Sequence, residues 1–464
     1  MKNKGKNFSE KMILETYTPL HIGSGEELKE DVDFIKENNS YFVVDIQKTL
    51  DSIQSEDRQL NKYFDTAQLT DLLKISEERQ GYTLNPLTVN NSLNGKKDIR
   101  EYLKDVFFKP ILPGTSLKGG IRTALWNLGL RKNNNLDYIG KKLEKEIFGS
   151  NPQKDIMRCL KVSDAYFEKE HLALGDIRIT NVSNNKIKWK NLATKKNIDE
   201  WELAKGIYPE VVKAESKAEF LFSWDEFLLN DISWTDINNN IKNSLGSYSK
   251  LKDFLNDYAL RMIENEIQFF KTYEYPLPIE FYEKLKSEIE KDKTNTAWLR
   301  LSWGSVWTGM TGLTNELLNE PYMKDIKQKI NQRKKNKNID YPKTRRLLVD
   351  KGNPQIPMGW VKLYPSDETV RNPYRKALKT NSKISNSSFS SILSKAIQEI
   401  KSKNNIPTTE EVFKGKSLAD YYQNIKDLEQ KKKVQEEIKK YWIEKEWWDN
   451  PSRNQKKLKA IYEY

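Results

Sequence analysis

Cysteine and histidine are nearly absent from this chain of 464 residues. Cys159 is the only cysteine, and His21 and His171 are the only histidines. One thiol excludes a disulfide framework and a zinc site built from several thiolates. Two histidines argue against a His-based metal cluster. We therefore expect no metal and no cofactor.

Long apolar runs are also missing. No apolar stretch approaches the roughly 18 residues that a membrane-spanning helix requires. The polar residues 1–6 lead into no apolar segment of the kind found in signal peptides. The phosphate-binding pattern G-x-x-x-x-G-K-[ST] is absent as well. The sequence therefore predicts a cytoplasmic protein with no membrane partner.

Positive charge is in excess. The chain has 79 Lys and Arg against 66 Asp and Glu, which gives a formal net charge of +13. Such a surplus indicates a polyanionic partner, although charge alone does not distinguish RNA from DNA or from an acidic membrane surface. The 12 Trp and 22 Tyr supply rings that can stack on bases as well as fill a core.

The segment 111–126 predicts a helix with an unusual start. Pro113 and Gly114 interrupt the chain, and the hydroxyls of Thr115 and Ser116 can cap the N–H groups of a first helical turn. Apolar residues then recur at helical spacing, which predicts one buried face. These are Leu117, Ile121, Ala124 and Leu125.

Gly119 and Gly120 stand inside this predicted helix, where each glycine costs about 1 kcal/mol relative to alanine. Lys118 and Arg122 lie four residues apart on the same face. A helix start with free N–H groups, little side-chain bulk and two cations can receive a phosphate. The alternative is that the glycines pack against a strand.

Residues 113–119, Pro-Gly-Thr-Ser-Leu-Lys-Gly, resemble the glycine-rich signature of the RAMP superfamily of CRISPR-associated proteins. Residues 18–25 are similar to the end of the first strand and the following loop in that family. Residues 301–307 and 356–363 resemble two Gly/Trp motifs of the large RAMP subunit that ends the backbone of the type III-A (Csm) effector complex.

The pattern of one helix with strands before and after it predicts an α+β fold of ferredoxin-like type, and the resemblance implies tandem RRM-like RAMP domains. We expect a RAMP domain at 1–225 with a helical insertion at about 51–105. A second, degenerate RAMP-like domain would occupy 226–370. A linker at 371–391 would lead to a charged helical C-terminal region at 392–464.

Individual elements are also predicted from the pattern. Residues 8–17 and 211–224 alternate in the manner of strands, and 241–270 has the apolar spacing of a helix. The most basic segment is 328–346. Trp442, Trp447 and Trp448 would form either the core of a small helical domain or a docking surface.

The resemblance implies a structural subunit that binds the 3′ part of a CRISPR RNA and caps the complex. Its partners would be other RAMP backbone and small subunits, with target RNA and host nucleases as further candidates. The RNA-binding candidates are His21, Gly23, Ser24, Gly25, Gly114, Thr115, Ser116, Lys118, Gly119, Gly120, Arg122, Trp303, Gly304, Gly359 and Trp360.

The two Gly/Trp pairs leave two interpretations open. Trp303–Gly304 and Gly359–Trp360 place a large ring beside a residue without a side chain. The ring could stack on a base while the backbone approaches closely. Alternatively, both pairs serve packing between domains.

A catalytic alternative is an endoribonuclease of the same family. Asp33 lies where the repeated backbone RAMP has the aspartate that cleaves target RNA, and some RAMP proteins use a histidine like His21 as a general acid or base. The competing interpretations are an acidic solvated loop for Asp33 and a structural role for His21. We expect no enzyme. A protein scaffold without direct RNA contact is the remaining alternative.

Overall fold

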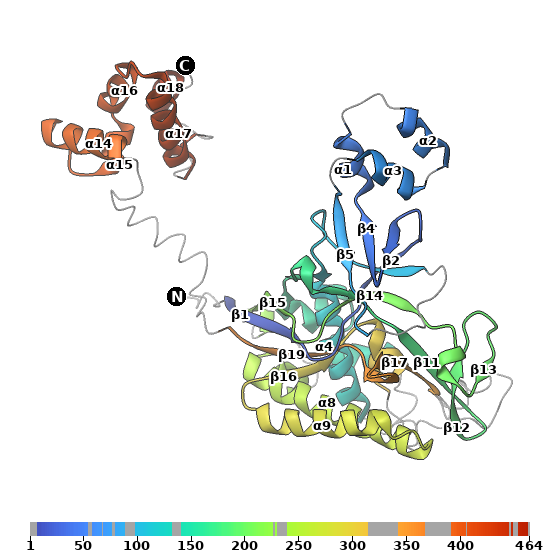
Figure 1. Cartoon of the computed structure of the whole chain (residues 1–464). Helices are drawn as coiled ribbons and strands as arrows, with labels where there is room; N and C mark the ends of the chain where they lie inside the picture. Colours follow the sequence, from blue (N-terminus) through green and yellow to red (C-terminus); the bar gives the residue numbers. More distant parts are fainter. Residues whose placement is uncertain are drawn as a thin grey trace. The chain divides into compact units, whose positions relative to one another are not determined.

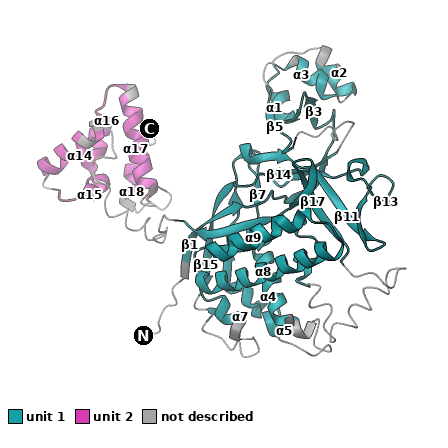
Figure 2. Ribbon diagram, turned by 60° about the horizontal axis from the view of Figure 1, so that its bottom comes forward, with its two compact units in different colours: residues 1–370 teal, residues 371–464 magenta. Residues whose placement is uncertain are grey.

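The computed structural model gives the arrangement of most of the chain (Figure 1). It describes residues 7–53, 58–66, 68–76, 79–88, 98–131, 141–225, 228–229, 239–313, 342–366, 391–404, 406–444, 447–448 and 453–462. The chain forms two compact units, residues 1–370 and 371–464 (Figure 2). Among the described helices, none has the length and hydropathy needed to cross a membrane.

The main sheet of the first unit is built around β1 (Asn7–Thr16). The strand order is β16-β19-β1-β15-β8, and all neighbouring strands are antiparallel. The other strands are β8 (Leu160–Val162), β15 (Lys217–Asp225), β16 (Ala297–Arg300) and β19 (Trp360–Pro365). Strands from both sides of residue 225 therefore share this sheet, and a domain boundary at 225 stays a prediction.

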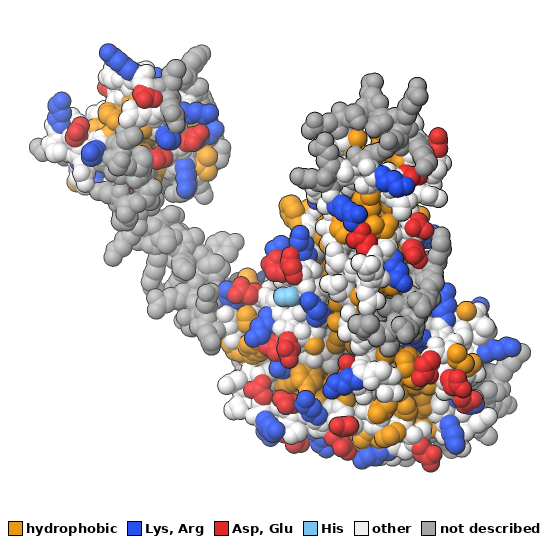
Figure 3. All heavy atoms as spheres, in the orientation of Figure 1, with side chains coloured by type: hydrophobic (Ala, Val, Ile, Leu, Met, Phe, Trp, Pro, Cys, Tyr) orange, Lys and Arg blue, Asp and Glu red, His pale blue; other side chains and the backbone are white. Residues whose placement is uncertain are grey.

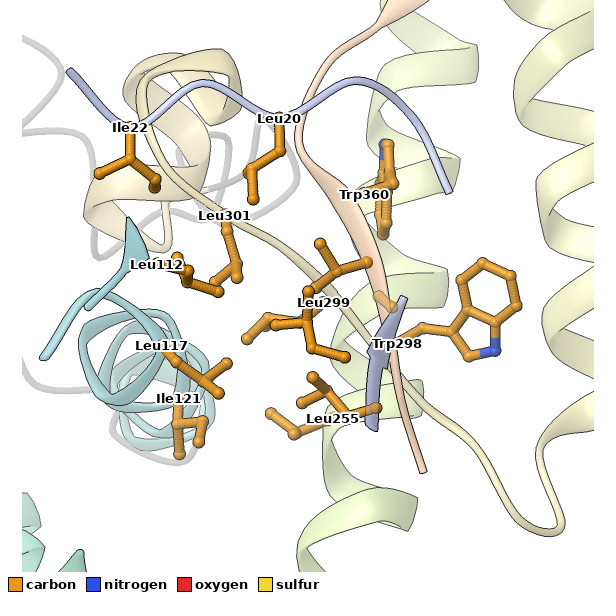
Figure 4. Packing of buried hydrophobic residues seen from close by; sticks show 14 of the residues in the cluster. Leu20, Ile22, Leu112, Leu117, Ile121, Leu255, Trp298, Leu299, Leu301 and Trp360 are labelled. Atoms are coloured by element: carbon orange, nitrogen blue, oxygen red, sulfur yellow. The ribbon is translucent and has the colours of Figure 1, made fainter. Parts of the chain in front are cut away.

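Three helices pack with this sheet. These are α4 (Gly114–Arg131), α8 (Tyr248–Thr272) and α9 (Leu277–Asp292). Helix α8 lies beside α4 and α9 (Figure 2). It also contacts β16, and α4 contacts β8. Leu117 and Ile121 of α4 face Leu299 and Leu301 in the core (Figure 4). The predicted apolar face of the 111–126 helix is therefore confirmed.

The predicted strand 211–224 is wrong in its extent. The structure has two strands there, β14 (Tyr208–Val212) and β15, which belong to different sheets. Glu215 between them has a φ of 63°, so the chain turns at that point. Similarly, the helical run 241–270 is divided into α7 (Asn239–Ser244) and α8, because the Ser247 side chain caps α8 by accepting from the Lys250 N–H.

The remaining described strands of the first unit form four further sheets. One sheet has the order β10-β14-β6-β2, with β10 (Leu172–Leu174), β6 (Ile99–Tyr102) and β2 (Gly23–Leu28). A second has the order β13-β12-β11-β17-β18, with β13 (Asn197–Ile198), β12 (Lys186–Lys190), β11 (Ile177–Ser183), β17 (Thr344–Asp350) and β18 (Asn353–Pro357). The others are β3 (Phe34–Glu37), β4 (Ser40–Val44) and β5 (Gly81–Leu84), and the pair β7 (Ile111–Leu112) and β9 (Ala165–Tyr166).

The region 51–105 contains both helices and strands. Helices α1 (Ile46–Asp51), α2 (Arg58–Thr66) and α3 (Leu69–Ile75) precede β5 and β6. A separate small core holds the helices against β4. Short helices complete the unit: α5 (Lys141–Phe148), α10 (Val306–Thr311) and the 3-10 turns Pro152–Lys154, Ile156–Cys159, Lys169–His171, Trp201–Leu203 and Trp303–Ser305.

The second unit is a group of helices with its own core. Its helices are α14 (Ser391–Asn404), α15 (Thr409–Lys414), α16 (Lys416–Gln423), α17 (Leu428–Glu444) and α18 (Arg453–Tyr462). Trp442 is fully buried, Trp448 is nearly so and Trp447 packs against them, which agrees with the core interpretation of these rings. Residues 371–390 of the predicted linker and 314–341, which include most of the basic segment 328–346, lie outside the described residues.

Candidate nucleic-acid interface

The sequence motifs singled out above meet in the first unit, although they lie far apart in the chain. The Gly359 N–H donates to the Pro19 carbonyl (3.0 Å), and the Leu301 N–H donates to the Gly359 carbonyl (2.7 Å). The Ser302 hydroxyl donates to the His21 carbonyl. The segments around residues 19–21, 301–302 and 359 are thus joined by hydrogen bonds.

Helix α4 begins one residue before the predicted cap. It starts at Gly114, so Thr115 and Ser116 lie in its first turn and do not cap it. The Gly114 N–H donates to Asp164 Oδ1 (2.7 Å), so a carboxylate of the protein occupies this helix end. A Cβ at Gly114 would lie 2.2 Å from the Val162 carbonyl oxygen, which explains the glycine by close packing.

The two glycines differ in their surroundings: one fits the interpretation of an open helix surface, and the other fits the interpretation of close packing. Gly119 is exposed, and a Cβ built there would have no atom within 4 Å. A Cβ at Gly120 would lie 2.6 Å from Leu301 Cδ2 and 3.0 Å from Leu299 Cδ2. Gly120 therefore serves the packing of α4 against the segment around β16 (Figure 4), whereas the Gly119 side of the helix is open to a ligand.

The two predicted cations on α4 also differ. Arg122 donates to Asp155 Oδ2 (2.8 Å) and Glu144 Oε1 (3.2 Å), and its guanidinium carbon lies 3.6 Å from the centre of the Phe148 ring. Lys118 has no ion pair with any described residue. Partial burial lowers the pKa of Lys118, the Asp155 carboxylate opposes this shift, and the neighbouring Arg122 adds to it. Arg122 is engaged within the protein, so Lys118 is the better candidate.

His21 is held as a neutral imidazole. Its Nδ1 lies 2.7 Å from the Glu210 carbonyl oxygen, which can only accept, so Nδ1 carries the proton. The ring is 3 % exposed and lies edge-on to Tyr102 and Trp303. Burial lowers the pKa of His21 to about 4, with smaller contributions from nearby cations. A role as acid or base near neutral pH therefore has no support in this geometry.

The predicted loop Gly23-Ser24-Gly25 is the beginning of β2, so the prediction of a loop is wrong. Gly23 pairs with Tyr102, and the Ser24 hydroxyl donates to Glu101 Oε2 (2.8 Å). Gly25 has a φ of 102°, and a Cβ there would have no neighbour within 4 Å. The register is irregular between Gly23 and Glu27, which leaves the backbone around Gly25 open.

Three residues of the Gly/Trp motifs are packing positions. A Cβ at Gly304 would lie 2.6 Å from Met358 Cβ. Gly359 has a φ of 88°, and its Cβ would lie 2.3 Å from the Leu301 carbonyl oxygen. Trp360 is 0 % exposed, so it offers no face to a base. Stacking on RNA is therefore excluded for Trp360 in this conformation.

Trp303 is different, because it is partly exposed and lies beside two arginines that its sequence context does not reveal. The guanidinium carbons of Arg346 and Arg100 lie 3.9 Å and 5.4 Å from its ring centre. Arg346 also donates to the Trp303 carbonyl. Burial lowers the pKa of Arg346 to about 10, and Arg100 and Arg300 add to this effect. Arg346 belongs to the predicted basic segment, but nothing in the sequence marks Arg100.

The backbone around Trp303 is strained. Ser302 has φ 68° and ψ −163°, and Val306 has φ 51° and ψ −162°. Such conformations cost roughly 1–3 kcal/mol each in residues other than glycine, and they often occur at functional sites. The Gly304 carbonyl accepts from Arg300 Nη2 (3.0 Å), which helps to hold the segment.

Asp33 closes a local turn. Its Oδ2 accepts from the Lys29 N–H (2.7 Å), and its own N–H donates to the Lys29 carbonyl (2.8 Å). Within the described part of the chain, no group of three or more His, Cys, Asp or Glu side chains is placed to hold a metal ion. The geometry of Asp33 therefore favours the interpretation as part of an acidic loop over a catalytic one.

Charge is mixed on the surface. On the face seen in Figure 3, basic and acidic side chains alternate where they are visible. The net positive charge of the chain is therefore not gathered into one continuous patch on that face. Candidates for a binding surface therefore come from local arrangements, such as Lys118 beside Gly119 or the arginines beside Trp303, and not from the overall charge.

Comparison with known proteins identifies relatives. A curated protein from Methanocaldococcus jannaschii, "CRISPR system Cms protein Csm5", is 24% identical over 390 residues, which cover 75% of this chain and 87% of the relative. A protein of the same name from Streptococcus thermophilus is 27% identical over 204 residues, which cover 38% of this chain and 56% of that protein.

The fold is also similar to a solved structure. One chain in the "Cryo-EM structure of Csm-crRNA-target RNA ternary complex in type III-A CRISPR-Cas system" matches with a TM-score of 0.56 and 21% identity. The match covers 77% of this chain and 100% of the other. In addition, the family model of the RAMP superfamily matches residues 13–299. This chain, with its mixed α and β structure, therefore belongs to the RAMP superfamily.

Proposed function

We propose that this chain is a CRISPR-RNA-binding structural subunit that caps the 3′ end of a type III-A interference complex and supports guide maturation and antiviral defence. Two relatives bear the name Csm5, and the matched solved chain comes from a complex of Csm proteins with crRNA and target RNA. The partners in this proposal are crRNA, target RNA and other Csm subunits.

The open side of α4 is the observation that carries the proposal. Gly119 is exposed with free space beside its Cα, and Lys118 next to it forms no ion pair with any described residue, although the Asp155 carboxylate acts on it at longer range. A ribose-phosphate chain can approach a helix closely only where side chains are absent. A cation at that place favours the phosphate, while the bases stay free for pairing.

We also propose a ferredoxin-like core for the RAMP fold of this chain. Along the chain, β1, α4, β8, β15, α8 and β19 follow the order β-α-β-β-α-β. In space the four strands lie as β19-β1-β15-β8, so the first strand is flanked by the third and the fourth. A second, degenerate domain within 226–370 would then have to share α8 and β19 with this core.

A role without catalysis is part of the proposal. His21 is buried with a pKa of about 4, and the Asp33 carboxylate is used in a turn. Both features favour structural roles over general acid–base or metal-assisted chemistry. The endoribonuclease alternative predicts that the purified protein cleaves precursor RNA and that His21→Ala or Asp33→Ala abolishes cleavage. Activity lost in either variant would overturn the non-catalytic role.

The central experiment compares RNA binding by the wild type and Gly119→Val. We expect the variant to keep the melting temperature within a few degrees, because nothing lies near the added side chain, and to bind single-stranded RNA at least about tenfold more weakly. Gly119→Ala is the size-graded control, since it adds only one methyl group at a place with no atom within 4 Å, and we expect it to bind RNA more strongly than Gly119→Val.

The salt dependence of binding separates the proposal from a scaffold role. Several phosphate contacts make the affinity of the wild type fall steeply with salt. A scaffold that only meets acidic protein neighbours would show little RNA binding at any salt concentration. If Gly119→Val is folded and binds as the wild type does, the open side of α4 is not an RNA contact.

A further inference from the structure

We infer that Arg346, Trp303 and Arg100 form a second RNA contact, a clamp for one backbone phosphate away from Gly119. The three residues come from β17, from the turn after β16 and from β6. The inference deepens the proposed function and rests on it, since the phosphate is taken to belong to the bound RNA.

The ring of Trp303 orients the two guanidinium groups. Their central carbons lie 3.9 Å and 5.4 Å from the ring centre, within the range of a cation–π contact. A guanidinium that rests on a ring keeps its N–H groups directed outward in one plane, and this geometry suits bidentate binding of a phosphate. One Arg346 nitrogen donates to the Trp303 carbonyl, and the remaining N–H groups of the guanidinium can donate to a phosphate.

The charge at this place is not balanced within the protein. Arg346 has no ion pair with any of the residues that the structure describes, and its pKa is lowered by burial and by neighbouring arginines. Arg100 has one weak partner, the half-exposed Glu27, with 3.6 Å between Nε and Oε1. Lys104 nearby is already paired with Glu101 and Glu210. An incoming anion would therefore find uncompensated positive charge.

His21 adds no charge to the clamp. Because its Nδ1 proton is donated to the Glu210 carbonyl and the ring is buried, the imidazole stays neutral at physiological pH. The attraction for a phosphate comes from the guanidinium groups alone, and these stay protonated throughout the physiological range.

The clamp is organised before a ligand arrives. The strained residues Ser302 and Val306 flank Trp303, and the Ser302 hydroxyl is tied to the His21 carbonyl. The Gly304 carbonyl is tied to Arg300. A segment that is fixed in this way loses little further conformational freedom when it binds, which favours affinity.

A phosphate fits this site better than a base does. Two guanidinium groups already lie over the Trp303 ring, so its surface is partly used, and the free hydrogen-bonding capacity consists of donors. Such a set binds an oxyanion. An acidic segment of a neighbouring protein could use the same donors, and the test below separates that outcome.

The test measures the affinity of the full chain for a single-stranded oligouridylate of about 20 nucleotides and, separately, for polyglutamate, each over a series of salt concentrations. The variants are Arg100→Gln, Arg346→Gln and Arg346→Lys. Arg261→Gln is the matched control, because Arg261 is as exposed as Arg100 (37% against 39% of the side chain) and also has a single exposed carboxylate partner.

We expect Arg100→Gln and Arg346→Gln each to weaken binding about tenfold and to reduce the slope of log affinity against log salt by about 0.7. Arg346→Lys should keep the slope but lose affinity, since an ammonium lacks the planar fork. Arg261→Gln should match the wild type. If Arg346→Gln lowers the melting temperature, its RNA affinity is not used, and the affinities of Arg100→Gln and Arg346→Lys test the clamp instead.

The outcomes separate the two proposals. A wild type that does not bind RNA removes the proposed function and the clamp with it. A wild type that binds with a steep salt dependence, while the Arg100 and Arg346 variants behave as Arg261→Gln does, overturns the clamp alone. If the Arg100 and Arg346 variants lose affinity for polyglutamate but keep the wild-type affinity for RNA, the site binds protein carboxylates. This outcome also overturns the clamp.

Discussion

The Ser302 hydroxyl donates a hydrogen bond to the carbonyl of His21, a residue 281 positions earlier in the chain. This bond fixes the segment that carries Trp303 to the segment that follows β1. His21 and Trp303 lie with their ring centres 5.6 Å apart as a result. The relationship explains how two motifs from opposite ends of the first unit come to form one surface.

Gly119 and Gly120 should respond in opposite ways to the same substitution. Gly120→Ala places a methyl group against Leu301 and Leu299, which costs about 1–3 kcal/mol; the gain in helix propensity offsets only part of this, so we expect a net loss in the free energy of unfolding. Gly119→Ala meets no atom and improves helix propensity, so we expect a gain of about 0.4–1 kcal/mol. Urea unfolding of the two variants measures both. Equal shifts would show that both glycines have the same environment.

The pH dependence of stability should report the burial of His21. The pKa of His21 is lowered from 6.5 to about 4, chiefly by burial. As pH falls below 6.5, the unfolded chain takes up a proton that the folded protein does not take up until about pH 4. Stability therefore decreases through this window, by about 3 kcal/mol in full.

His21→Gln isolates this effect. Glutamine does not titrate but can still donate to the Glu210 carbonyl. We expect the difference in unfolding free energy between the wild type and the variant to shrink as the pH is lowered from 6.5 to 4. Parallel pH profiles would show that His21 has an ordinary pKa. RNA affinity of the wild type should not change between pH 6 and 8.

Local patterns were sufficient for several elements of the fold. The strand predicted at 8–17 is β1 at residues 7–16, and the apolar face of α4 follows from its spacing. The strand predicted at 211–224 failed because alternation continues across two strands, and Glu215 gives no sequence signal for its left-handed conformation.

The site was predicted less completely than the fold. Gly119 and Lys118 became candidates because they belong to a recognisable motif, and their role in RNA binding stays a prediction. Arg100 was missed because its contact with Trp303 depends on the pairing of β6 with β2 and β14, which is a tertiary effect. The sequence could not show that Trp360 is buried while Trp303 is partly exposed, since both tryptophans lie beside a glycine.

The buried carboxylate of Glu266 should be important for stability. Its Oε2 lies 2.7 Å from Arg345 Nε and 3.9 Å from Arg300 Nη1, and both ion pairs are almost fully buried. Among the described residues, Glu266 is the carboxylate paired with the buried guanidinium groups of Arg300 and Arg345. Glu266→Gln leaves both without a counter-charge, so we expect a loss of about 3–5 kcal/mol in unfolding free energy. Chemical denaturation measures it.

Glu264→Gln is the matched control for this substitution. Glu264 lies on the same helix and pairs with Lys286 (3.1 Å), but its side chain is 61% exposed. An exposed ion pair contributes little, so we expect a change of less than about 1 kcal/mol. If both variants lose the same amount, the Glu266 cluster does not behave as a buried ionic network.

The helical unit should unfold independently of the first unit. Trp442 is 0 % exposed in the core of the helical unit, where Phe413 and Tyr441 stack with ring centres 3.9 Å apart. Trp442→Ala should destabilise this unit by about 3–5 kcal/mol and leave the RNA affinity unchanged. In calorimetry of the full chain, we expect one transition to move and the other to stay. Ile443→Ala, at a neighbouring side chain that is 48% exposed, should move neither transition. If Trp442→Ala shifts both transitions, the two units stabilise each other, and the helical unit is then part of the RNA-binding body rather than a separate module.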